Sequence, residues 1–186
     1  MSIHVRPGGP GDVPVLLQMF DDAVTWLTAR GSAGQWGTRP WSEDPQRIER
    51  IRGMAHGGGL SIAEIGGVPA GALVLTERPP AHIPPVNERE LYVDLLITAR
   101  SFTGRGVGAA LLDMARTEAR ARGITLLRVD CWAGGDGDLV RYYQGQDFTP
   151  TDRFDVNGWI GQVFEQRLNE QPSADAGSAR SAAPPR

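Results

Sequence analysis

Hydrophobic and polar residues follow two different periods along the chain, and the changes of period divide it into helices and strands. Apolar side chains recur at helical spacing in three segments, which are residues 13–29, 45–54 and 109–122. Short apolar runs bounded by glycine, proline or polar residues are typical of strands, and they cover residues 3–6, 60–65, 68–77, 91–98, 126–132, 154–156 and 161–168. A further helix is expected to start near Asp138.

The resulting element order is β-α-α-β-β-β-α-β-α-β-β. Strands interleaved with helices favour an α/β fold, here a single mixed central sheet of six to seven strands with helices on both faces. The length of 186 residues allows one domain with a sizeable core. We expect this domain to span residues 1–169, and residues 170–186, which have few large apolar side chains and no periodicity, predict a disordered tail.

Composition narrows the class of protein. Hydrophobic residues make up 40% of the chain and charged residues 22%, with a net charge of −3, which is typical of a globular protein and not of a nucleic-acid binder. No apolar run is long enough to span a bilayer. Cys131 is the only cysteine, so an intramolecular disulfide is impossible. We therefore expect a cytoplasmic protein without a membrane or nucleic-acid partner.

Histidine, cysteine and acidic residues show no metal-ligand spacing. His4, His56 and His82 are isolated from one another, and no H-x-x-x-H or C-x-x-C pattern occurs. We expect no structural or catalytic metal.

A glycine-rich turn after the apolar run Leu91–Thr98 is the strongest candidate for chemistry. It reads Thr103-Gly104-Arg105-Gly106-Val107-Gly108 and leads into a helix. The first turn of a helix leaves backbone N–H groups without partners, and glycine lets phosphates approach them closely. Arg105 would add a charge-assisted contact. The alternative is that the glycines only shape a strand–helix turn. The spacing matches neither a Walker P-loop nor the dinucleotide fingerprint.

The glycine turn and a second motif later in the chain resemble, in the same order, two motifs of the GCN5-related N-acetyltransferase (GNAT) superfamily. The family signature Gln/Arg-x-x-Gly-x-Gly/Ala falls on Thr103, Gly106 and Gly108, with Thr103 standing where the family has Gln or Arg. A later family motif, N-x-x-A/L-x-x-x-Y-x-x-x-G-F, has its tyrosine and phenylalanine in register at Tyr143 and Phe148. Asp136 replaces its asparagine and Asp147 its glycine. The resemblance covers about residues 3–168.

The resemblance implies the acyl-CoA N-acyltransferase fold, with acetyl-CoA as co-substrate. In that fold two neighbouring strands splay apart, and the pantetheine arm of the cofactor binds between them. The cofactor-binding residues it implies lie on the central strand and the glycine turn: Leu96, Ile97, Thr98, Thr103, Gly104, Arg105, Gly106, Val107, Gly108 and Ala109. Backbone near Leu96–Thr98 would provide the hydrogen-bond donor to the thioester carbonyl.

Acetyl transfer to an amine requires a base for the ammonium and an acid for the leaving thiolate. Strand alternation predicts that Tyr92, Asp94, Leu96 and Thr98 share one face, with Glu90 extending it. Asp94 is the candidate base, since a carboxylate among apolar residues has a raised pKa. Glu90 and ordered waters are alternative routes for removing the proton. The alternative role of Asp94 is a purely structural ion pair with Arg100 or Arg128.

Tyr143 matches the family tyrosine that points at the cofactor sulfur, so it is the candidate acid. The alternative is that Tyr143 only packs in the core, with its hydroxyl hydrogen-bonded. Cys131 suggests a ping-pong nucleophile, but a single cysteine on a buried strand is more often inert, which favours direct attack in a ternary complex.

The resemblance implies that the loop 31–44 and the helices on either side of it build the acceptor side. Gln35, Trp36 and Trp41 are therefore candidate substrate contacts, and the alternative is that both rings attach the loop to the core. Tyr92 and Asp130 are further candidates. Asp94, Asp130 and Asp136 would form an acidic wall that favours a cationic amine, unless arginines pair with them.

These observations favour an acetyl-CoA-dependent N-acetyltransferase for a small-molecule amine. A protein N-terminus or lysine is the alternative acceptor. A non-catalytic acyl-CoA-binding sensor and a generic phosphate-binding α/β protein are alternatives of other classes. A homodimer is implied only by the resemblance.

Overall fold

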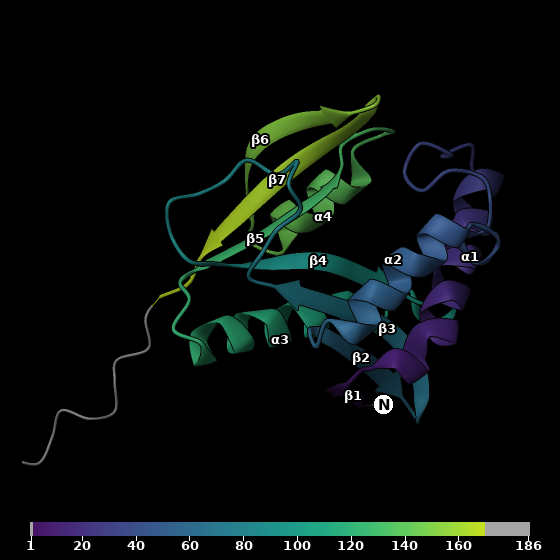
Figure 1. The fold of residues 1–186 in the computed structure, drawn as a ribbon, viewed down its shortest axis with the longest axis horizontal. Coiled ribbons are helices and arrows are strands. Elements are labelled where there is room, and N and C mark those ends of the chain that lie inside the picture. The colour runs from purple at the N-terminus through teal and green to yellow at the C-terminus, as the bar shows by residue number, and fades with distance from the viewer. Residues whose placement is uncertain (1, 170–186) are drawn as a thin grey trace, which may run out of the picture.

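The computed structural model describes residues 2–169, so the tail expected at residues 170–186 lies outside the described part (Figure 1). The strands are β1 Ile3–Pro7, β2 Leu60–Ile65, β3 Val68–Thr76, β4 Glu90–Thr98, β5 Leu126–Trp132, β6 Thr149–Val156 and β7 Trp159–Arg167. The α-helices are α1 Val13–Ala29, α2 Pro45–His56, α3 Val107–Ala121 and α4 Asp138–Gly145, and the 3-10 turns are Pro10–Asp12, Trp41–Glu43 and Arg100–Phe102. This order confirms the α/β prediction.

All seven strands form one mixed sheet in the order β1-β2-β3-β4-β5-β7-β6. Only the β4–β5 pair is parallel, because α3 connects these two strands as a crossover. The other pairs are antiparallel, and β6–β7 closes the far edge as a hairpin. Hairpin β6–β7 starts earlier than predicted, at Thr149, because exposed polar residues occupy most of β6 and hide it from a search for apolar runs.

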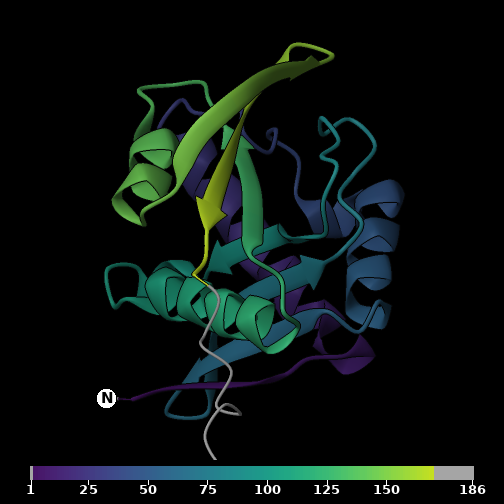
Figure 2. The same ribbon diagram turned by 90° about the vertical axis from the view of Figure 1, so that its left-hand side faces the viewer.

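Helices cover both faces of the sheet, and each face has its own core. In Figure 2, α3 crosses in front of the sheet and α1 lies behind it. The α3–α4 face buries Leu111, Leu112 and Tyr143 against β3, β4 and β5. The α1–α2 face buries Leu16, Phe20 and Ile51. Apolar residues spaced for one helical face therefore pack as the sequence predicts.

The register of β4 shifts at Asp94. On β3, Val74 pairs with Leu95 and the next residue pairs with Val93, so Asp94 is an extra residue without a partner on β3. A bulge of this kind reverses which side chains face which side. Val93 packs in the α3–α4 core, whereas Leu95 packs in the α1–α2 core. The prediction that Tyr92, Asp94, Leu96 and Thr98 share one face is therefore wrong.

Strands β4 and β5 part after the bulge. Their pairing covers Glu90↔Leu126 to Val93↔Val129, yet β4 continues to Thr98 and β5 to Trp132. The edges that face each other beyond this point lack a neighbouring strand. The resemblance implied this splay, and it opens the sheet where the candidate residues gather.

Candidate functional site

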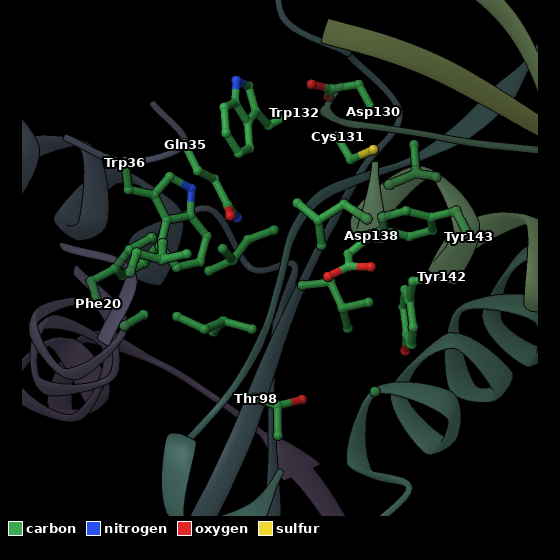
Figure 3. A pocket seen from close by; sticks show the side chains of 18 of the residues that line it. Phe20, Gln35, Trp36, Thr98, Asp130, Cys131, Trp132, Asp138, Tyr142 and Tyr143 are labelled. Atoms are coloured by element: carbon green, nitrogen blue, oxygen red, sulfur yellow. The ribbon is translucent and has the colours of Figure 1, made fainter. Parts of the chain in front are cut away.

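A cavity of about 920 Å³ lies at this divergence. It extends from the loop before α2, past the exposed edges of β4 and β5, to the start of α3 (Figure 3). Most predicted site residues line it: Gln35, Trp36, Trp41, Asp94, Leu96, Ile97, Thr98, Thr103, Gly104, Gly106, Val107, Gly108, Ala109, Asp130 and Tyr143. Arg105 and Tyr92 do not. The guanidinium carbon of Arg105 lies 5.5 Å from the ring centroid of Phe102.

The glycine turn has the conformation of an anion cradle. Gly104 and Gly106 both have φ of +77°, and a Cβ at either would point into open space, so their requirement for glycine is conformational. Gly106 is the N-cap of α3, and the first backbone bond of the helix runs from the N–H of Ala110 to the carbonyl of Gly106. The N–H groups before Ala110 thus point outward at the positive end of the helix dipole.

Gly108 is glycine for a different reason. A Cβ at this position would collide with the hydroxyl of Tyr142, which lies over the start of α3. Figure 3 shows the two neighbouring tyrosines of α4 pointing in different directions, Tyr142 toward α3 and Tyr143 toward Cys131. Tyr142 therefore lines the end of the cavity beside the glycine turn.

Backbone groups of β4 face the gap beside β5. The N–H of Ala99 donates to the carbonyl of Ala70, on the β3 side, at 2.9 Å. Because successive residues of a strand direct their hydrogen-bonding groups to opposite sides, those of Thr98 and Leu96 point toward β5. Since β5 has already diverged, they are available to a ligand, as expected for the thioester donor.

Two half-buried carboxylates, Asp94 and Asp130, lie deeper in the cavity. Burial raises the pKa of both groups above the ordinary aspartate value, and their mutual repulsion adds to the rise at Asp130. His82 and Arg50, which also line the cavity, oppose the rise at each of them. Among residues 2–169, neither aspartate forms a salt bridge, and Asp136 at the cavity wall forms none either.

Two residues proposed from the sequence, Glu90 as an alternative base and Tyr92 as a substrate contact, lie outside the cavity lining. Glu90 is buried and pairs with Arg128, its carboxylate 3.0 Å from the guanidinium, so it does not reach the cavity. Tyr92 is fully buried, and its hydroxyl donates a hydrogen bond to Asp130. Tyr92 therefore supports an acidic residue of the cavity from the protein side.

Tyr143 and Cys131 lie where the cavity meets the α3–α4 core. Tyr143 is 6% exposed and packs on Phe148 and Phe164 at ring-centroid distances of 5.9 and 5.5 Å. Burial raises the pKa of its hydroxyl well above the usual tyrosine value. A tyrosine in this state remains a proton donor. Burial raises the pKa of the Cys131 thiol to about 12, which disfavours a thiolate nucleophile.

Aromatic side chains wall the opposite end of the cavity. Trp41 is 6% exposed and stacks on Phe20, with ring centroids 4.0 Å apart. Trp36 is half-buried beside Phe20 and faces the cavity with Gln35 (Figure 3). The indole N–H of Trp159 donates to the carbonyl of Gln35 at 3.0 Å, which ties the loop before α2 to β7. Trp41 thus attaches the loop to the core, whereas Trp36 is accessible to a ligand.

Sequence reasoning missed several cavity residues, among them His82, Arg50, Trp132 and Tyr142. His82 and Trp132 gave no signal, since they stand in a proline-rich loop and at a strand end. Arg50 lies on the polar side of a short amphipathic helix, where an exposed arginine is ordinary. The doubled tyrosine of α4 was a visible signal, because both rings of such a pair cannot enter the core.

Solved structures of other proteins share this fold. An acetyltransferase of the GNAT family from Listeria monocytogenes aligns with a TM-score of 0.68 and 19% identity over 89% of this chain and 95% of that one. A putative acetyltransferase from Salmonella typhimurium, solved with its cofactor acetyl-CoA, aligns at 0.61 with 17% identity over 95% of this chain and all of the other. A ribosomal-protein-alanine N-acetyltransferase from Brucella melitensis aligns with a TM-score of 0.62 and 20% identity, over 89% of this chain and 99% of that one.

Sequence comparison identifies the family. No curated protein matches the chain. No helix within residues 2–169 is long and apolar enough to cross a membrane, and the same residues contain no group of three or more potential metal ligands from His, Cys, Asp and Glu. The model of the acetyltransferase (GNAT) family matches residues 21–148, a stretch that contains the glycine turn, both cavity aspartates and Tyr143. The chain belongs to the GNAT acetyltransferase family.

Proposed function

We propose that this protein transfers an acetyl group from acetyl-CoA to the primary amine of a small molecule, by direct attack in a ternary complex. One observation carries the proposal. A single cavity joins a glycine cradle at the start of α3 to an acidic, aromatic-walled end beside Asp94, Asp130 and Trp36. The first end suits a pyrophosphate and the second a cationic amine, so donor and acceptor can meet between β4 and β5.

The residues present fit acetyl-CoA. The N–H groups at the start of α3 and the hydroxyl of Tyr142 would hold the pyrophosphate, while the exposed edge of Leu96 and Thr98 would bond the pantetheine arm and the thioester carbonyl. The bound thioester supplies the activated acyl group.

Asp94 is the proposed base, with Asp130 as its neighbour. Either carboxylate must be ionised to accept the proton of the ammonium, and their raised pKa values make them stronger bases than an exposed aspartate. The pair also attracts the cationic acceptor before it loses its proton. His82 faces the same pair and is a route by which the proton can leave toward solvent.

Tyr143 is the proposed acid for the departing thiolate. Its ring is fixed by Phe148 and Phe164, and its protonated hydroxyl stays at the cavity wall near Cys131. The buried, protonated thiol of Cys131 supports direct attack by the amine over a covalent acetyl-enzyme.

The enclosed aromatic wall favours a small acceptor over a protein chain. Trp36, Gln35 and Trp159 form one connected rim, because the indole of Trp159 is hydrogen-bonded to the carbonyl of Gln35. A peptide N-terminus or lysine remains the alternative acceptor, and a sensor that binds acyl-CoA without turnover is the alternative of another class.

The test is calorimetric binding of acetyl-CoA, followed by a screen of amines and short peptides for turnover. Gly106→Glu should abolish binding, since it adds a charge and a side chain to the cradle. Gly67→Glu is the matched control: Gly67 has φ of +78° and open space at its Cβ, like Gly106, but it lies in the β2–β3 turn. Equal loss in both variants, or no binding to wild type, would refute the proposal. Binding without turnover of any acceptor would favour the sensor, and turnover of peptides alone the protein acceptor.

A further inference from the structure

Two arginines flank the indole of Trp26 at the end of α1. The guanidinium carbon of Arg100 lies 3.6 Å from the ring centroid, and that of Arg30 lies 4.7 Å from it. Arg100 follows β4, whereas Trp26 and Arg30 belong to the end of α1, so the cluster joins two elements that are far apart in sequence. All three residues line the cavity.

The described part of the chain provides neither of these two cations with a counter-ion. Among residues 2–169, no carboxylate forms an ion pair or a hydrogen bond with Arg30 or Arg100. The Nε atom of Arg100 is buried and is the one buried side-chain nitrogen or oxygen of these residues without a hydrogen-bond partner. Burial lowers the pKa of Arg100, and the nearby charge of Arg30 lowers it further. An arginine in such surroundings is destabilised until an anion approaches it.

The position of the cluster limits what the anion can belong to. Arg100 is two residues beyond Thr98, and the Oγ1 atom of Thr98 lies 3.7 Å from the place of a Cβ on Gly108. The cluster therefore lies beside the glycine turn, where the N–H of Thr103 donates to the carbonyl of Arg100 at 3.3 Å, and beside the end of α1. A ligand that spans the cavity can place one anionic group there and its reacting centre between β4 and β5.

A purely structural role explains only part of this arrangement. Arg30 caps the end of α1, where a cation compensates the helix dipole, and stacking on Trp26 contributes to packing. Neither effect calls for a second arginine beside the first. A second like charge raises the repulsion, and the Nε donor of Arg100 stays unpaired.

We propose that Arg30 and Arg100, held by Trp26, form a binding subsite for an oxyanion, phosphate or carboxylate, of a ligand in the cavity. Guanidinium groups bind these anions with two parallel hydrogen bonds. The inference rests on the proposed function only for the source of the anion, which is either the 3′-phosphate of the cofactor or an acidic group on the acceptor amine.

The first experiment uses inorganic phosphate and thermal unfolding. Wild type is compared with Arg30→Gln, Arg100→Gln and Arg100→Lys, and with Arg120→Gln on the exposed side of α3 as the matched loss of charge. Phosphate should raise the melting temperature of wild type and Arg120→Gln by more than that of either cluster Gln variant, with Arg100→Lys in between. An equal phosphate response in all five proteins would overturn the proposal, whatever their melting temperatures without phosphate.

The second experiment separates the two sources by calorimetry with CoA and 3′-dephospho-CoA. If the subsite takes the 3′-phosphate, Arg100→Gln should weaken CoA binding about tenfold and leave dephospho-CoA binding unchanged. If it takes the acceptor, both cofactors bind the variant as they bind wild type, and the variant raises KM for acceptors with a carboxylate or phosphate but not for neutral-tailed amines. Failure of wild type to bind either cofactor would refute the proposed function, while the phosphate response would still test the subsite.

Discussion

The hydroxyl of Tyr92 donates a hydrogen bond to Oδ1 of Asp130, from a ring that has no exposed surface. This bond fixes a cavity carboxylate from the protein side and leaves its other face toward the cavity. It also favours the ionised form of Asp130, since hydrogen bonding from Tyr92 lowers the pKa that burial and Asp94 raise. The tyrosine thus positions an acid without touching a ligand.

Tyr92→Phe should move the pH profile of the reaction. Without the donor the pKa of Asp130 rises further, so if the acidic pair is the base, the acid limb of kcat/KM shifts to higher pH while the affinity for acetyl-CoA is kept. The free energy of unfolding should fall by about 1.5–3 kcal/mol, as for a bond to a charged group. Steady-state kinetics from pH 5 to 9, roughly the range around neutral pH, tests this. An acid limb that stays in place despite lower stability would exclude Asp130 from the titrating pair.

Asp94→Asn should stabilise the protein at neutral pH. Burial raises the folded-state pKa of Asp94 above that of the unfolded chain, so its contribution to stability is complete below the unfolded pKa and is lost as the pH rises through the folded one. An asparagine does not ionise, and we expect a melting temperature higher by about 2–4 °C at pH 7, as for about 1 kcal/mol. The difference should shrink as the pH is lowered.

The exposed Asp152 on β6 provides the control for this variant. Asp152→Asn removes the same charge and should have the melting temperature of wild type both at pH 7 and at lower pH. Asp94→Asn should also lower kcat by about 10²–10⁴-fold, the usual contribution of a general base. Full activity in Asp94→Asn would assign proton removal to Asp130 or to water.

The sequence predicted the helices and the glycine turn well, because local patterns determine both. Apolar spacing defined α1, α2 and α3 almost to the residue, and Asp44 caps α2 through the N–H groups of Gln46 and Arg47. The glycine turn was visible because two of its residues adopt positive φ, which favours glycine wherever it occurs.

The acceptor end was less predictable, because it depends on one extra residue in one strand. The bulge at Asp94 is a property of the pairing between β3 and β4, and no local pattern marks it. The contacts of Tyr92 with Asp130 and of Glu90 with Arg128 also depend on the pairing of β4 with β5. The stacking of Arg100 on Trp26 likewise joins residues whose sequence neighbours give no hint of contact.

The neighbouring tyrosines of α4 should separate chemistry from binding. Tyr143→Phe should lower kcat by about 10²-fold or more with little change in acetyl-CoA affinity, since it removes a proton donor and keeps the packed ring. Tyr142→Phe should weaken acetyl-CoA binding about tenfold and leave kcat nearly unchanged, because its hydroxyl lies over the start of α3. Calorimetry and initial rates measure both, and the reverse pattern would assign the acid to Tyr142.

The two tryptophans before α2 should differ in what they support. Trp41 is buried and stacked on Phe20, so Trp41→Ala should lower the free energy of unfolding by about 3–5 kcal/mol. Trp36 is half-buried at the cavity wall, and Trp36→Ala should cost less stability but raise KM for the acceptor, with acetyl-CoA affinity kept. Urea unfolding and acceptor kinetics compare the two. If Trp36→Ala left KM for every acceptor unchanged, the aromatic wall would be a loop anchor, and the acceptor would have to bind elsewhere in the cavity.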